Sequence, residues 1–380
     1  MNSKPLRNTV FYLHRYIGLF VGLILIIVGL TGSLLVFQKE LNQFQIRQEF
    51  GQVIPQEQRV PIDTVLENIK TSFASQPNFK LSGINTPPDP HIPYRAFLQS
   101  PKEERLEVFV NPYTGVVMGS RQWEKTIIGL TYKLHYQLLA GDIGQIIVGI
   151  AALLLLILSI TGIVLWPGWR KLIAGFKIKL QAHPKRVNFD IHKVTGVVAA
   201  VFLTMIAFTG FCWNFYDQAQ PTIHAVTFTP IRPTPVSQPI AGKSALSLTE
   251  ILPKADAALP GAITTFIRLP QKPDGVFLIG KKLPQENSDD YGESRVYLNQ
   301  YTGEILQLTN GLKLSRADHV LSWFTPMHYG TFGGLTTRIL YVFVGIAPLI
   351  LLFTGFVMYR YHRQDNLSRE QALEMAKSVK

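Results

Sequence analysis

The chain has 380 residues, of which 47% are hydrophobic, and it carries a formal net charge of +12. Its single cysteine, Cys212, excludes an internal disulfide, a covalent C-x-x-C-H haem attachment and a thiolate zinc site. This length allows several soluble domains or a protein that crosses a membrane several times.

Four apolar runs favour the membrane class, because each reaches the roughly 20 residues that cross a bilayer core. They cover residues 16–37, 143–166, 194–215 and 338–359. The first run is too long for the apolar core of a signal peptide, and no small-residue cleavage site follows it. We therefore interpret it as the first membrane span.

The charges beside the runs predict the orientation. Between the second and third runs, seven Lys and Arg residues face one acid, Asp190, and both chain ends are also basic. Short basic flanks stay in the cytoplasm. We therefore expect both termini and the 170–190 loop inside the cell, and the segments 38–130 and 216–325 outside. The basic excess is then a signal of topology and contact with membrane lipid, and nucleic acid is not an expected partner.

The two outer segments have the same pattern of a helix followed by alternating strands, with a Tyr-Thr-Gly turn at 113–115 in one and at 301–303 in the other. Each predicts a small α+β domain. The spans repeat as well, because His14 and His192 both precede a Thr-Gly pair by the same interval. His135 and His328 each precede a Thr-Gly pair by 26 residues. These matches predict an internal two-fold duplication.

The four histidines predict two ligand pairs. His14 and His192 begin outward-going spans, whereas His135 and His328 precede inward-going spans, so each side of the membrane receives two imidazoles. Two facing histidines in a four-helix bundle are typical of b-type haem ligation. We therefore predict two b haems, with these histidines as the axial iron ligands and no other catalytic residue.

The sequence also allows other roles for the histidines and for the residues near them. A zinc or copper site could use the same imidazoles, and His362 or Met327 could replace a ligand. Arg15 and Lys193 could pair with haem propionates or anchor the chain at the cytoplasmic face. The glycines of the four Thr-Gly pairs could lie against a porphyrin or allow close helix packing. These glycines are Gly32, Gly162, Gly210 and Gly355.

The elements "LHRYIGL…GLTGSLLVF", "PYTGVV", "LHYQLLAG…TGIVLWPGWRK", "IHKVTG" and "MHYGTFGG" resemble the PepSY-associated transmembrane proteins, and among them siderophore-iron reductases of the FoxB type. The resemblance covers nearly the whole chain. It implies four spans, two PepSY-like periplasmic domains, two b haems and the reduction of a ferric siderophore in the bacterial periplasm.

The predicted protein is an integral membrane α-helical four-span bundle with two small α+β (PepSY-like) periplasmic domains, located in the bacterial inner membrane with both termini cytoplasmic. Its predicted parts are the spans 1–37, 131–169, 191–215 and 326–362, the outer domains 38–130 and 216–325, the loop 170–190 and the tail 363–380. We expect a reductase that passes electrons from a cytoplasmic or quinol donor to a ferric siderophore. The alternatives are a non-enzymatic module that binds a periplasmic partner and a permease for ferric chelates.

Overall fold

The computed structural model describes residues 4–76, 78–100, 105–286 and 291–378. The chain forms two compact units. The helical unit contains Met1–Gln38, Leu130–Thr222 and Trp323–Lys380, and the sheet unit contains Lys39–Gly129 and Ile223–Ser322. Each outer segment of the sequence thus belongs almost entirely to the sheet unit.

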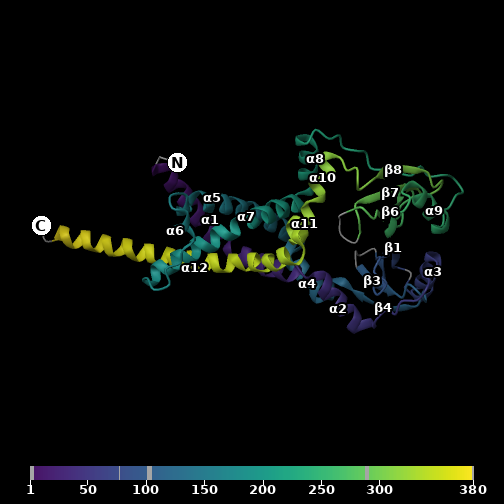
Figure 1. Ribbon diagram of the computed structural model, residues 1–380, viewed down its shortest axis with the longest axis horizontal. Coiled ribbons are helices and arrows are strands. Elements are labelled where there is room, and N and C mark those ends of the chain that lie inside the picture. The colour runs from purple at the N-terminus through teal and green to yellow at the C-terminus, as the bar shows by residue number, and fades with distance from the viewer. Residues whose placement is uncertain (1–3, 77, 101–104, 287–290, 379–380) are drawn as a thin grey trace. The chain divides into compact units, whose positions relative to one another are not determined.

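Four long helices form the helical unit (Figure 1). They are α1 (Lys4–Leu35), α5 (Gly141–Leu165), α7 (Pro184–Asn214) and α12 (Gly334–Ser378). Helix α1 packs against α5 and α12, and α7 packs against the same two helices. The helices therefore form a ring in which α1 and α7 occupy opposite corners. All four contain a stretch long and apolar enough to cross a membrane, as the sequence predicted.

Two of the predicted spans begin with a separate short helix. Helix α4 (Ile127–Gln137) ends before Leu138 and Leu139, whose φ angles are 51° and 57°, and α5 starts only at Gly141. Helix α11 (Phe324–Tyr329) ends at Gly330, with φ 69°, and a 3-10 turn, η3 (Thr331–Gly333), leads into α12. The predicted single helices 131–169 and 326–362 are each broken in this way. The remaining helical pieces of this unit are η2 (Pro167–Trp169), α6 (Leu172–Phe176) and most of α8 (Tyr216–Val226).

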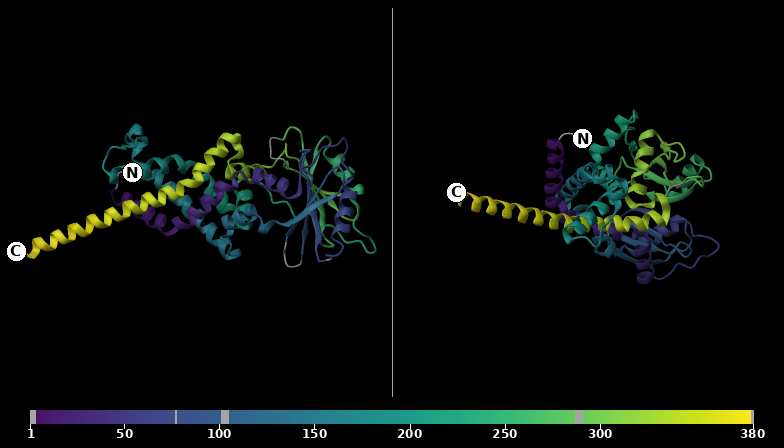
Figure 2. Two further views of the ribbon diagram at one scale, coloured as in Figure 1. Left: turned by 90° about the horizontal axis from the view of Figure 1, so that it is seen from below. Right: turned by 60° about the vertical axis from the view of Figure 1, so that its left-hand side comes forward.

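The sheet unit is built on one antiparallel sheet, whose strands are drawn as arrows in Figures 1 and 2. The strand order is β4-β3-β2-β1-β5-β6-β7-β8. Its strands are β1 (Lys80–Asn85), β2 (Tyr94–Gln99), β3 (Arg105–Val110), β4 (Val117–Gln122), β5 (Ile263–Arg268), β6 (Val276–Lys282), β7 (Ser294–Asn299) and β8 (Ile305–Thr309). The two outer segments do not fold as separate domains, because β1 pairs with β5 across the junction. This pairing uses the backbone groups that two separate sheets would leave open at their edges.

One face of the sheet carries the hydrophobic core. Helices α3 (Ile62–Ser72) and α9 (Leu248–Ala258) pack on it, one from each half of the sheet. Alternate strand residues such as Ile279 and Val296 are fully buried there, as expected for a sheet with one covered face. Near its other face, Phe50 of α2 (Gln38–Phe50) stacks on Phe109. The unit also contains η1 (Trp123–Lys125) and α10 (Arg316–Ser322).

Candidate functional site

Four histidines of the helical unit face one another in two pairs. The ring centroids of His14 on α1 and His192 on α7 are 6.3 Å apart, with an angle of 86° between the ring planes. The centroids of His135 on α4 and His328 on α11 are 6.1 Å apart, with an angle of 79°. The structure therefore brings together the same two pairs that the sequence spacing suggested.

A threonine on the neighbouring helix fixes each imidazole. The Nδ1 atom of His14 lies 2.9 Å from Thr161 Oγ1, and this hydroxyl lies 2.7 Å from the carbonyl oxygen of Ile157. Because the hydroxyl donates its only proton to that carbonyl, it accepts a hydrogen bond from His14 Nδ1–H. The proton of a neutral imidazole is then on Nδ1, and Nε2 keeps its lone pair for a ligand.

The same arrangement recurs at the other three histidines. Each histidine Nδ1 lies close to a threonine hydroxyl that also bonds to a carbonyl of its own helix. The pairs are His192–Thr354 at 2.8 Å, His328–Thr209 at 2.8 Å and His135–Thr31 at 3.1 Å. The Nδ1 atom of His135 also lies 2.9 Å from the carbonyl oxygen of Val28, which can only accept. All four imidazoles therefore present an unprotonated Nε2.

The glycine after each threonine makes room for the same ring. A Cβ atom at Gly32 would lie 3.0 Å from Cε1 of His135, which is too close for an ordinary contact. The corresponding distances are 3.2 Å from Gly210 to His328, 3.3 Å from Gly162 to His14 and 3.5 Å from Gly355 to His192. Each Thr-Gly pair therefore forms the binding surface for an imidazole of the neighbouring helix. The threonine bonds to the ring and the glycine packs against it.

The spacing of each pair would leave room for one metal ion between the two imidazoles. A metal–nitrogen bond of about 2 Å on each side puts two in-line imidazole centroids roughly 6 Å apart. Among the described residues, no group of three or more His, Cys, Asp or Glu side chains converges. A protein zinc site uses three or four such ligands, whereas haem iron takes its other four from the porphyrin. The donor set therefore fits b-type haem better than zinc.

Arg15 adds a second observation that fits haem. Its Nε and Nη1 atoms are buried without a hydrogen-bond partner, whereas Nη2 donates to Tyr16 Oη at 2.9 Å. The guanidinium lies over four aromatic rings, which belong to Phe11, Tyr12, Tyr16 and Tyr359. Buried donors without a partner are costly, and a carboxylate such as a haem propionate would satisfy them. Arg15 directly follows His14 on α1, so its backbone lies at the level of the first pair.

Lys193 follows His192 but has other partners. Its Nζ donates to Asp190 Oδ1 at 2.8 Å and to the carbonyl oxygens of Ala174 and Lys177, both at 3.0 Å. These contacts use all three protons of the ammonium group. Lys193 therefore ties the start of α7 to α6 and the loop after it, and no proton remains for a propionate. Helix α7 begins at Pro184, inside the predicted 170–190 loop.

The two rival ligands named from the sequence lie outside the pairs. His362 is exposed near the middle of α12. The backbone oxygen of Met327 accepts a hydrogen bond from Tyr341 Oη at 2.7 Å, and it is the ring of the next residue, His328, that faces His135.

The chain matches one protein family over most of its length. The model of the PepSY-associated TM region family matches residues 11–361. The chain belongs to the PepSY-associated TM region family. No curated protein matches the chain.

One residue near the second pair was missed by the sequence analysis of this PepSY-associated protein. The indole ring of Trp213 has its centroid 4.7 Å from that of His328. Trp213 follows Thr209 by four residues on α7, so both point to the same side of the helix. The four-residue spacing can be read from the sequence, but only the structure shows that this side of α7 faces His328.

The contacts between these glycines and the imidazole rings predict how much a methyl group at each position would destabilise the protein. We expect Gly32→Ala to destabilise the helical unit by about 1–3 kcal/mol, because the new methyl group would press on His135. Gly355→Ala is the matched control, since its methyl group would meet His192 at an ordinary contact distance. Thermal unfolding of both variants in detergent measures the difference. Equal losses of stability would contradict this role of the glycines.

Proposed function

We propose that this protein is a di-haem b oxidoreductase of the bacterial inner membrane that reduces ferric iron in siderophores. The observation that carries the proposal is the pair of facing, Nδ1-protonated imidazoles at each of two levels of the helical unit. Thr31, which contacts His135, follows His14 by 17 residues on α1. At about 1.5 Å per residue, the two levels are separated by roughly 25 Å along this helix.

Two b-type haems bound at these levels would supply one-electron chemistry near both surfaces of the membrane. The chain's own residues would hold the two haems, orient them and adjust their reduction potentials. His14 and His192 would ligate one iron, and His135 and His328 the other. The threonine hydroxyls keep each ring in one tautomer and make Nε2 a better electron donor, as hydrogen-bond acceptors on the other ring nitrogen do for histidines that bind metals. Arg15 would neutralise a carboxylate beside the first level.

The distribution of charge supports the direction of the reaction. The basic loop between α5 and α7 and the basic chain ends favour the cytoplasm. The sheet unit then belongs to the periplasm, and the His135–His328 pair lies at the periplasmic side. The matched His-to-Thr-Gly intervals and the two four-strand halves of the sheet support an internal duplication. Electrons would enter from a cytoplasmic or quinol donor.

The resemblance of the His-centred sequence motifs to siderophore-iron reductases is the reason for proposing a ferric siderophore as the acceptor. One electron converts Fe(III) to Fe(II) in the chelate. Fe(II) has a lower charge and is bound less tightly by hard oxygen donors, so reduction releases the metal from its carrier.

Ligand substitutions test the haem assignment. We expect His14→Ala and His192→Ala each to remove one haem and to leave the other intact, because each removes an axial ligand of the first level. His135→Ala and His328→Ala should remove the other haem. The measurements are haem content per chain and the reduced-minus-oxidised absorption spectrum of the purified protein, with the exposed His91→Ala as control. Two haems in all four variants would refute the assignment, and a colourless wild type would favour a non-enzymatic module.

Cysteine labelling tests the orientation. The only native cysteine, Cys212, is buried. We therefore expect little labelling of the wild-type protein, and labelling of a variant reports the introduced cysteine. We expect Ser72→Cys, exposed on α3, to react with an impermeant thiol reagent in intact spheroplasts. Gln181→Cys, exposed between α6 and α7, should react only after lysis. The reverse pattern would put the sheet unit in the cytoplasm.

Reoxidation kinetics test the reaction. Protein reduced with dithionite under anaerobic conditions should be reoxidised by a ferric siderophore, while an Fe(II) chelator develops colour at a matching rate. His14→Ala should stop electron transfer from the cytoplasmic side and still turn over when reduced chemically, whereas His328→Ala should lose both. Haem that stays reduced with every ferric chelate but is oxidised by a protein or quinone would overturn the reductase proposal.

A further inference from the structure

The sheet unit has a cluster of four arginines on the face opposite α3 and α9. In the cross-strand register, Asn85 lies opposite Arg95 on one side and Phe266 on the other. Gly280 in turn pairs with both Phe266 and Arg295. Directly paired residues project from the same face of a sheet, so one row carries Arg95 and Arg295.

The next two rows bring in one further arginine each. Gly83 of β1 pairs with Phe97 and with Arg268. Arg105 pairs with Gln99 one step further along β2 and β3. We call Arg95, Arg105, Arg268 and Arg295 the arginine patch. It combines two strands from each half of the sheet, so it exists only because β1 and β5 are paired.

Two phenylalanine rings form the floor of the arginine patch. The guanidinium carbons of Arg105, Arg95 and Arg268 lie 4.4, 5.2 and 5.2 Å from the ring centroid of Phe97. Those of Arg295 and Arg268 lie 4.8 and 4.9 Å from the centroid of Phe266. Cation–π contacts at these distances hold the guanidinium groups against the sheet. Arg268 touches both rings and so lies at the centre of the patch.

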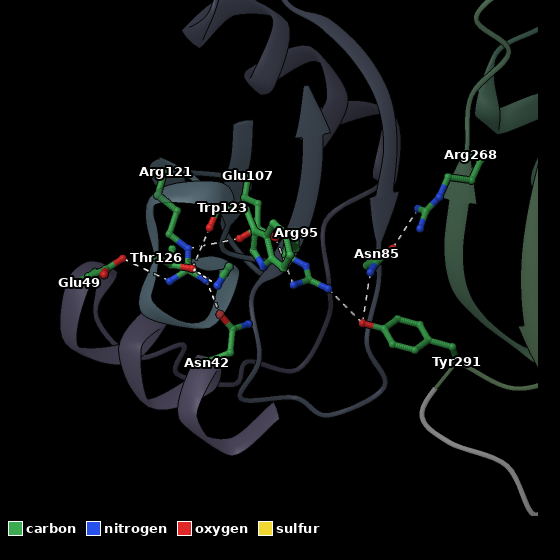
Figure 3. A network of polar contacts seen from close by, with 11 residues as sticks. Asn42, Glu49, Asn85, Arg95, Glu107, Arg121, Trp123, Thr126, Arg268 and Tyr291 are labelled. Atoms are coloured by element: carbon green, nitrogen blue, oxygen red, sulfur yellow. Dashed lines mark hydrogen bonds and ion pairs between the residues drawn. The ribbon is translucent and has the colours of Figure 1, made fainter. Parts of the chain in front are cut away.

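Glycine and hydrogen bonds fix the position of Arg268. A Cβ atom at Gly83 would lie 3.0 Å from Arg268 Cδ, and one at Gly280 would collide with the ring of Phe266. Arg268 Nη1 donates to Asn85 Oδ1 at 3.0 Å, and Asn85 Nδ2 lies 3.2 Å from Tyr291 Oη (Figure 3). Arg95 Nη2 donates to the same Tyr291 oxygen at 3.3 Å. The arrangement is therefore built into the sheet.

Among the described residues, one carboxylate forms an ion pair with the arginine patch. It belongs to Glu107, which lies 3.3 Å from Arg95 and is shared with Arg121, a residue outside the patch, at 3.2 Å. Burial, and then the nearby charge of Arg105, lowers the pKa of the Arg268 guanidinium below its usual value. Like charges gathered on one face of a sheet repel one another, and a bound anion would relieve this repulsion. Arg105 is exposed and the other three side chains are half-buried, so solvent reaches the patch.

We propose that the arginine patch binds a polyanionic ferric chelate of the tris-catecholate class. This inference rests on the proposed function and names the substrate class. Phe97 and Phe266 are on strands two steps apart, so the floor is roughly 10 Å wide, which suits a complex of three aromatic ligands better than a single phosphate group. Guanidinium groups pair with oxyanions and also stack on aromatic faces, and an anionic catecholate ring offers both. A neutral tris-hydroxamate complex offers neither charge nor aromatic rings.

Gallium complexes test binding apart from electron transfer, because Ga(III) takes the place of Fe(III) and is not reduced under these conditions. The full-length protein in detergent is titrated with a hexadentate tris-catecholate gallium complex of net charge −3 and with a neutral hexadentate tris-hydroxamate complex. We expect the trianion to bind at least about tenfold more tightly and to weaken with added salt. Inorganic phosphate is the competitor that represents small anions.

Charge-removing variants locate the site. Arg268→Gln, and Arg105→Gln at an exposed position that does not risk the fold, should each weaken trianion binding about tenfold, the cost of losing a charged hydrogen bond. Arg232→Gln removes the same charge from an exposed position between α8 and α9 and should leave binding within about twofold. All variants should keep the haem spectrum of the wild type.

Several results would overturn the inference. These are equal binding of both gallium complexes, unchanged binding in Arg105→Gln and Arg268→Gln, and displacement of the trianion by phosphate at equal concentration. Equal binding of both gallium complexes by a wild-type protein that does reduce a ferric chelate would refute the tris-catecholate site and leave the proposed reductase function in place. Tight, patch-dependent binding of the gallium trianion without reduction of any ferric chelate would refute the reductase function and leave the binding site in place.

Discussion

The hydrogen bond from a histidine Nδ1–H to a threonine hydroxyl on the neighbouring helix is the interaction on which the helical unit depends. It occurs four times and links α1 to α5, α7 to α12, α4 to α1 and α11 to α7. In an apolar membrane interior, a polar group without a partner costs several kcal/mol. Each histidine is therefore held by one neighbouring helix, with its proton on Nδ1 and none on Nε2 in the neutral imidazole.

This constraint also explains the residues around the histidines. The threonine must lie on the helix face that meets the imidazole, and the residue after it must be small enough for the ring to fit. Glycine satisfies the second requirement, since even the Cβ of alanine at Gly32 would lie 3.0 Å from His135. The breaks at Leu138–Leu139 and at Gly330 separate α4 and α11 from the spans that follow them. His135 and His328 can then face each other from short helices that are not bound to the direction of α5 and α12.

The sheet unit shows a comparable dependence on one pairing. The contact between β1 and β5 turns two four-strand halves into one sheet. It also puts Arg95 and Arg105 of one half beside Arg268 and Arg295 of the other, around the rings of Phe97 and Phe266. Neither half alone would hold four guanidinium groups on two aromatic rings. The proposed anion site and the joined sheet are thus consequences of the same backbone pairing.

The sequence by itself determined the features that depend on local composition and periodicity. These are the four apolar helices, the alternating strands, membership of a PepSY-associated membrane family, and the recurring interval from histidine to Thr-Gly. The interval is readable because a helix has a constant rise and repeat, so equal spacing gives equal height and the same side.

Only the tertiary structure decided which groups meet across distance in the chain. His14 and Thr161 are separated by 147 residues, and no local sequence pattern predicts that their side chains form a hydrogen bond. Lys193 is adjacent to a histidine in sequence, but its ammonium group is used by Asp190 and by backbone carbonyls. The two outer segments each have the pattern of a complete small domain, and whether their first strands pair is set by which edges the fold brings together. Helical and strand periodicity describes one element at a time, whereas a site or a continuous sheet depends on packing between elements.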